Sequence, residues 1–376
     1  MRKCLIFLLL AAALATGVCA AADVLQEEAA ILGADKLEDA LPAEAEEALD
    51  GISPLEQGSF TEGFKQVLSG AVKGLGGWMR QGAQVIAALL AAALLCGFGA
   101  EAKGGAGAAV RMAGCLGIAT VCTDGAGTKS SLAYTSGLYG MIALAQETLD
   151  GLGSFSALLL PVLSSALTAS GGVTSGGTLY AGATLLISVL TSLIRSFLIP
   201  CVYCYFFLAV AQYAIGDDRL ECLRELAGWT VKTALRAAVA AFTAYLTLTG
   251  LLAGAADEMT LKAAKSVIST AIPVVGGMIS EASQAVLTSA ALIRNSAGIF
   301  GLLAVLAVGR GPFLQIAVQY LALRVTTALS GFLAMQEHIK LLACAADAMG
   351  YMLAMTGSAM LMVIVAVCAF LKAVNG

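Results

Sequence analysis

Few residues in this chain have the type and spacing that catalysis or metal binding requires. Cys201 and Cys204 form a C-x-x-C pair inside a long apolar stretch with no second pair of ligands, so two buried small side chains are the favoured interpretation. The single histidine, His338, cannot form a metal cluster by itself and is expected at a membrane interface. The glycine-rich stretch 171–177 lacks the Gly-Lys-Ser/Thr ending of a phosphate-binding loop. The sequence therefore predicts no enzyme activity, no metal and no cofactor.

A second group of residues consists of charged side chains within or near apolar stretches. Such side chains are unfavourable in lipid, so they are expected to face the interior of a helix bundle or a membrane interface. The sequence pattern does not assign partners to them. The five candidates are Arg195, Arg236, Glu281, Arg294 and Arg324.

A proline and two glycines interrupt the apolar stretch 271–281, which is too short to cross a bilayer. Broken backbone at membrane depth is tolerated only where protein buries it or water lines it. Pro273, Gly276 and Gly277 are therefore candidates for a re-entrant, pore-lining or tightly packed element. An ordinary turn between helices at the membrane surface is the other interpretation.

The composition indicates the solvent in which this chain folds. Of its 376 residues 59% are hydrophobic and 12% charged, whereas about 25% are charged in ordinary soluble domains. The 21 Lys and Arg residues are scattered, and the net charge of -4 provides no basic face for binding nucleic acid. These values predict an all-α, polytopic helical membrane protein whose main environment is the lipid bilayer.

The apolar stretches predict between seven and ten membrane crossings, because roughly 20 apolar residues suffice for one helical span. The stretch 179–215 would be about 55 Å long as one helix, so it is expected to turn back between Arg195 and Pro200. The predicted spans are 83–100, 105–122, 132–147, 154–170, 179–195, 197–215, 230–254, 297–310, 313–331 and 348–371.

The N-terminal part divides into two predicted segments ahead of the membrane domain at 81–376. Residues 1–21 have the basic, apolar and small-residue layout of a cleavable signal peptide, and an uncleaved first span is the alternative. Residues 22–80 form a short acidic extracytoplasmic segment, since 12 of the 25 acidic residues lie there. Apolar residues at helical spacing over 60–75 predict a helix lying along a membrane or a partner. The segment is either a solvated spacer or a docking element.

The stretch Ala-Ile-Pro-Val-Val-Gly-Gly at 271–277, followed by Arg-Asn-Ser-Ala-Gly-Ile-Phe-Gly-Leu at 294–302, resembles the stage III sporulation protein AE family of spore-forming Firmicutes. The resemblance covers the chain from about residue 60 onward, and Arg294 stands where relatives are expected to have lysine. It implies a non-enzymatic, multipass subunit of the channel or secretion-like complex that links the mother cell to the engulfed forespore. It also implies a location in the mother-cell membrane around the forespore and a need for the protein after engulfment.

The resemblance further implies partners. These are the sister proteins of the stage III sporulation A operon, including an ATPase and ring-forming subunits, and indirectly the forespore stage II sporulation protein Q. Two other functions stay open on the sequence. One is a self-sufficient small-solute permease, against which the chain shows no internal repeat of broken spans. The other is a structural anchor whose acidic segment recruits partners.

Overall fold

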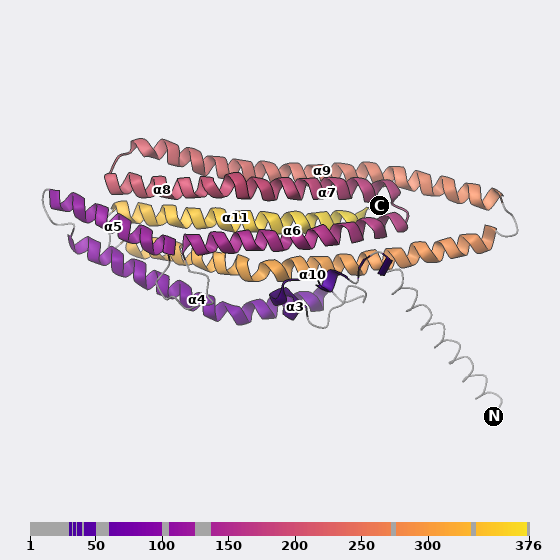
Figure 1. The fold of residues 1–376 in the computed structure, drawn as a ribbon, viewed down its shortest axis with the longest axis horizontal. Helices are drawn as coiled ribbons and strands as arrows, with labels where there is room; N and C mark the ends of the chain where they lie inside the picture. Colours follow the sequence, from indigo (N-terminus) through magenta and orange to yellow (C-terminus); the bar gives the residue numbers. More distant parts are fainter. Residues whose placement is uncertain are drawn as a thin grey trace, which may run out of the picture.

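Every described element of the computed structural model is a helix (Figure 1). The structure describes residues 30–31, 33–34, 36–39, 41–49, 60–99, 105–124, 137–271, 276–331 and 336–373. The predicted signal peptide and Pro273 lie outside these residues. The helices are α2 (Lys36–Asp39), α3 (Ala43–Ala48), α4 (Phe60–Gly99), α5 (Gly105–Asp124), α6 (Leu138–Ala169), α7 (Val173–Leu193), the π-helix η1 (Ile194–Leu198), α8 (Ile199–Ile215), α9 (Arg219–Ala271), α10 (Gly276–Ser330) and α11 (Gln336–Lys372).

Five helical stretches of the described chain are long and apolar enough to cross a bilayer. Their length and composition agree with the all-α membrane class predicted from the sequence. They also exceed the thickness of a hydrocarbon core, because 32 residues make a helix of about 48 Å. The five are Leu138–Ala169, Val173–Ile215, Arg219–Thr249, Ala290–Ser330 and Gln336–Lys372.

The predicted turn between Arg195 and Pro200 is wrong. The chain continues from α7 through the π-helix into α8 without reversing, as one helical stretch of 43 residues (Figure 1). Pro200 is near the first residue of α8 and has no N–H to donate. The wider π turn just before it changes the hydrogen-bond ladder locally, so the helix accommodates the proline ring without ending.

Two further pairs of predicted spans are single helices. The stretches 132–147 and 154–170 fall largely in α6, which contains Pro161, and 297–310 and 313–331 fall in α10, which contains Pro312. Proline and glycine are tolerated inside such helices because neighbouring helices and local adjustments satisfy the freed backbone groups. The number of separate spans was therefore overestimated for these parts of the chain.

The long helices pack side by side in a bundle, with α6, α10 and α11 in contact with one another and α7 and α9 along one side (Figure 1). The α9–α10 hairpin extends beyond one end, and the α4–α5 hairpin extends beyond the other (Figure 1). Phe155, Phe300 and Phe370 are fully buried between these helices. Gly301 allows α10 to approach α6 closely, since a Cβ there would lie 2.6 Å from a Leu159 methyl group.

The acidic segment contacts the bundle where it is described. α2 packs against α6, and α3 packs against α10 and α4, with Leu37 and Leu49 buried. The predicted helix over 60–75 is confirmed as the first half of α4, which continues without a break past residue 80. Of its apolar side chains, Val67 is buried whereas Phe64 and Val72 are exposed.

Candidate functional site

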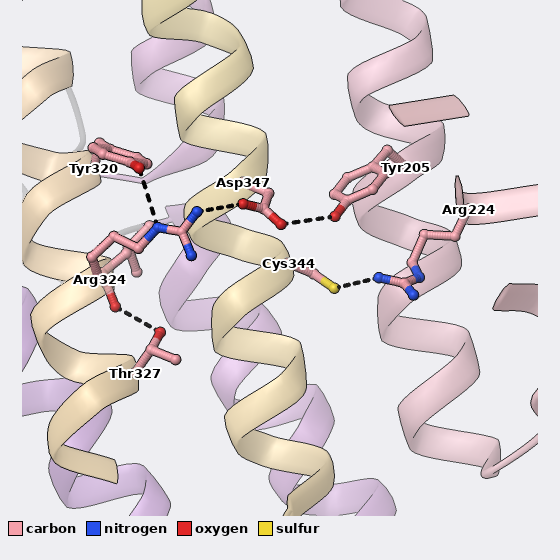
Figure 2. Close-up of polar contacts among 8 residues, drawn as sticks. Tyr205, Arg224, Tyr320, Arg324, Thr327, Cys344 and Asp347 are labelled. Carbon is pink, nitrogen blue, oxygen red and sulfur yellow. Dashed lines mark hydrogen bonds and ion pairs between the residues drawn. The ribbon is translucent and has the colours of Figure 1, made fainter. Parts of the chain in front are cut away.

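Polar side chains from four helices meet in one half of the bundle and form what we call the interhelix network (Figure 2). In apolar helices such groups are informative, because each needs a hydrogen-bond or ion-pair partner from another helix. The network consists of Tyr205 from α8, Arg224 from α9, Tyr320 and Arg324 from α10, and Cys344 and Asp347 from α11.

Asp347 is the central acceptor of the network. The Arg324 Nη2 donates to Asp347 Oδ1 at 2.6 Å, and the Tyr205 hydroxyl lies 3.4 Å from Asp347 Oδ2 (Figure 2). The Arg324 Nε donates to the Tyr320 hydroxyl at 3.2 Å, which orients the guanidinium along its own helix. The two charged side chains are 43% and 37% exposed, so water weakens this ion pair. Asp347 thus connects α8 and α10 through α11.

Arg224 forms the second centre of the network. Its Nη1 lies 2.9 Å from the sulfur of Cys344 (Figure 2). Its Nη2 lies 3.2 Å from Glu221 Oε1, one turn earlier in α9. The guanidinium carbon lies about 6 Å from the ring centroids of Tyr205 and Tyr213, within the range of cation–π attraction. Arg224 therefore joins α9 to α11 and α8 by several weak contacts.

The contacts of the network join side chains of different helices: Tyr205 to Asp347, Arg324 to Asp347 and Arg224 to Cys344. Within the described residues no three His, Cys, Asp or Glu side chains are grouped to hold a metal ion. Charge-assisted contacts between helices instead set how far each helix can slide along its neighbour.

The predicted charged residues fall in different environments. Arg324 lies in the network, and Arg236 is exposed on α9. Arg195, in the π-helix, forms an ion pair with Asp150 of α6, and both side chains are exposed. Arg294 is 1% exposed, and its Nε and Nη1 have no hydrogen-bond partner among the described residues.

The predicted re-entrant element lies at the far end of the α9–α10 hairpin. Gly276 and Gly277 begin α10 and Glu281 lies in its second turn, while Pro273 is outside the described residues. This hairpin extends past the rest of the bundle (Figure 1). The re-entrant or pore-lining role of these residues stays a prediction.

One prediction about isolated residues is corrected. Cys204 is exposed and Cys201 is half-buried, so the C-x-x-C pair is not a buried one; both thiols are free. The reason is that α8 does not fold back, which leaves one of its faces outside the bundle. His338 is fully buried near the start of α11, and its place at a membrane interface stays a prediction.

A groove with hydroxyl side chains runs between α6 and α7 and has a volume of about 460 Å³. Arg195 lies at one end of it, beside the π-helix. Several hydroxyls donate to carbonyls of their own helix, as Thr191 does to Ile187, so they need no external partner. The lining hydroxyl residues are Ser156, Thr184, Ser188, Thr191, Ser192 and Ser196.

Sequence reasoning missed most of the network. One signal was available, because Asp347 is the only charged residue in the stretch 341–371 and a lone acid in an apolar helix requires a partner. Tyr320 and Arg324 are four positions apart on α10, but no spacing rule connects the members that lie on different helices. The missed residues are Asp150, Tyr205, Arg224, Tyr320, Cys344 and Asp347.

Comparison with known proteins adds an independent result. A family model described as Stage III sporulation protein AE matches residues 130–373, a range that contains the whole interhelix network. The protein named Stage III sporulation protein AE of Bacillus subtilis (strain 168) is 24% identical over 162 residues, which is 43% of this chain and 41% of that protein. The matched stretch thus spans less than half of that relative's length. No solved structure matches the chain.

Proposed function

The chain belongs to the stage III sporulation protein AE family, and from this premise we propose that it is a non-enzymatic, multipass subunit of the membrane complex that links mother cell and forespore. The family match supports the sporulation role. The single structural observation that carries the proposal is a set of five apolar helices joined by polar contacts that suit structural support. Such a subunit serves as a membrane platform, needed for forespore development after engulfment.

The proposed location is the mother-cell membrane around the forespore. The proposed partners are the sister proteins of the same operon, including an ATPase and ring-forming subunits, and through them stage II sporulation protein Q. The acidic segment is the proposed contact for them, because its acidic side chains Glu46 and Glu47 are exposed while Leu49 anchors it to the bundle. A partner with a basic surface would complement these carboxylates.

The test is a clean deletion in the host, complemented with the wild-type chain and followed by imaging and a late forespore-specific reporter. The expected result is complete engulfment followed by small forespores with a dark reporter, and full recovery on complementation. Immunoblots of the membrane fraction control for expression. Normal sporulation in the deletion strain would contradict the proposal. Solute uptake by the purified protein alone in vesicles would favour the permease instead.

A further inference from the structure

Charged side chains are distributed unevenly along the bundle. One half of the long helices, which we call the charge-free half, contains no Asp, Glu, Lys or Arg. Its segments lie side by side: a Cβ at Gly182 would meet the Tyr245 ring, and one at Gly301 would meet Leu159. The charge-free half comprises 151–169 of α6, 173–194 of α7 and η1, 237–249 of α9, 295–309 of α10 and 358–371 of α11.

The length of the charge-free half matches a bilayer. Its segments in α6 and α7 would each be roughly 30 Å long at about 1.5 Å per residue, similar to the hydrocarbon thickness of a typical membrane. The full helical stretch Val173–Ile215, with 43 residues, is about twice that length. A bilayer perpendicular to the bundle therefore covers only one half of it.

The other half, which we call the network half, is unsuited to lipid. It contains the interhelix network and comprises 199–215 of α8, which has no charged residue, and the charged segments 219–236 of α9, 311–330 of α10 and 336–357 of α11. Charged side chains that face lipid lose their hydration without gaining a partner. The exposed charged residues of α9 in this half are Arg219, Glu221, Glu225, Lys232 and Arg236.

Within the charge-free half, α7 and α9 form an outer wall that the protein itself covers poorly. Of the charge-free segments, 173–194 has 7 of 22 residues buried and 237–249 has 2 of 13, against 9 of 19 in 151–169 and 10 of 15 in 295–309. We call this surface the α7–α9 wall. An apolar surface of this kind needs a covering partner. Its large exposed apolar side chains are Val173, Tyr180, Leu185, Val189, Tyr245 and Leu248.

The opposite wall of the bundle differs because the acidic segment covers it. Pro42 lies within 4 Å of the position of a Gly151 Cβ, and Gly33 lies similarly close to Val162. The exposed side chains Lys36 and Glu46 belong to this covering segment. They make the opposite wall polar, whereas the α7–α9 wall is uncharged and apolar.

We propose that the α7–α9 wall is a lipid-facing surface of the protein and that lipid covers the charge-free half along this wall, whereas the acidic segment keeps the opposite wall out of the hydrocarbon. The network half then lies outside the hydrocarbon, where its exposed charges are hydrated. The occupant of the wall is lipid acyl chains, because its α7 segment has bilayer length, the wall lacks charge, and charged residues such as Arg195 and Arg236 bound it.

The test uses tryptophan fluorescence of the full chain in vesicles whose phospholipids carry bromine deep in the acyl chains. Both native tryptophans, Trp78 and Trp229, lie outside the charge-free half, so the unmodified protein should show little quenching. In a background where both are replaced by phenylalanine, Leu185→Trp and Leu248→Trp should be quenched several-fold more strongly. Leu226→Trp is the matched control, because Leu226 is equally exposed on α9 but lies in the network half.

Aqueous iodide provides the complementary measurement. It should quench Trp229 and Leu226→Trp but not the two probes in the wall. Equal quenching of all positions by brominated lipid would overturn the proposal, as would stronger quenching of the network half. Wall probes that are shielded from both lipid and iodide would show that another protein covers the wall, which also overturns it. The native-tryptophan measurement needs no substitution and is decisive if a variant fails to fold.

Discussion

The charge-free half and the network half are built from the same helices but are held together by different contacts. In the charge-free half, small residues let helices approach, as Gly298 does beside Leu371 and Gly301 beside Leu159. In the network half, Arg324 and Arg224 reach across to α11. Apolar side chains gain little by leaving lipid for another helix, so close packing replaces the hydrophobic effect there. Polar contacts determine the register where water is present.

Arg294 is the exception in this comparison. It lies at the edge of the charge-free segment of α10, it is 1% exposed, and two of its nitrogens lack partners among the described residues. A buried cation without a compensating acceptor destabilises a fold. Replacing Arg294 is therefore expected to raise the free energy of unfolding, whereas replacing Arg324 in the network half is expected to lower it.

The largest expected effect is on close packing in the charge-free half. Phe155→Ala should lower the free energy of unfolding by about 3–5 kcal/mol, because this fully buried ring would leave a cavity between helices. The measurement is denaturant or thermal unfolding of the detergent-purified protein. Phe207→Ala is the control, since Phe207 is 47% exposed on α8 and should lose less than about 1 kcal/mol. Equal losses would show that the buried core described here is incorrect.

The next effect concerns Arg294. Arg294→Met should raise the free energy of unfolding by about 1–3 kcal/mol, because it replaces a buried charge, two of whose nitrogens lack a partner among the described residues, with an apolar chain of similar length. Arg236→Met, at an exposed position, should change stability by less than about 0.5 kcal/mol. The same unfolding assay measures both variants. A decrease for Arg294→Met would mean that Arg294 has an acceptor outside the described residues.

The smallest effect is the coupling within ion pairs. A double-mutant cycle with Arg324→Met and Asp347→Asn should give a coupling of about 1 kcal/mol, since both side chains are partly exposed. The cycle with Arg195→Met and Asp150→Asn should give less, below about 0.5 kcal/mol, because these side chains are 40% and 59% exposed. A larger coupling for the second pair would remove the distinction between the network and an ordinary surface ion pair.

The sequence predicted an all-α protein in a lipid bilayer, and the structure agrees with the helical class. The reason is that helix hydrogen bonds are local, so apolar stretches free of charge identify helices without knowledge of their neighbours. The first and last residues of the helices were predicted less well. Pro161, Pro200 and Pro312 signal helix ends in a soluble chain, but in this bundle they lie inside or at the joints of continuous helical stretches.

The candidate site was predicted only at Arg324, and by its residue type alone. Its partner Asp347 is 23 positions away, and Tyr205 is 142 positions from Asp347. Such distances are closed by helix packing, which no local pattern encodes. The sequence by itself determined that this is a helical, apolar chain with a few charges in need of partners. The tertiary structure decided which charges pair, that Arg294 is buried, and which helices turn an uncharged wall outward, because these depend on the rotation and register of one helix against another.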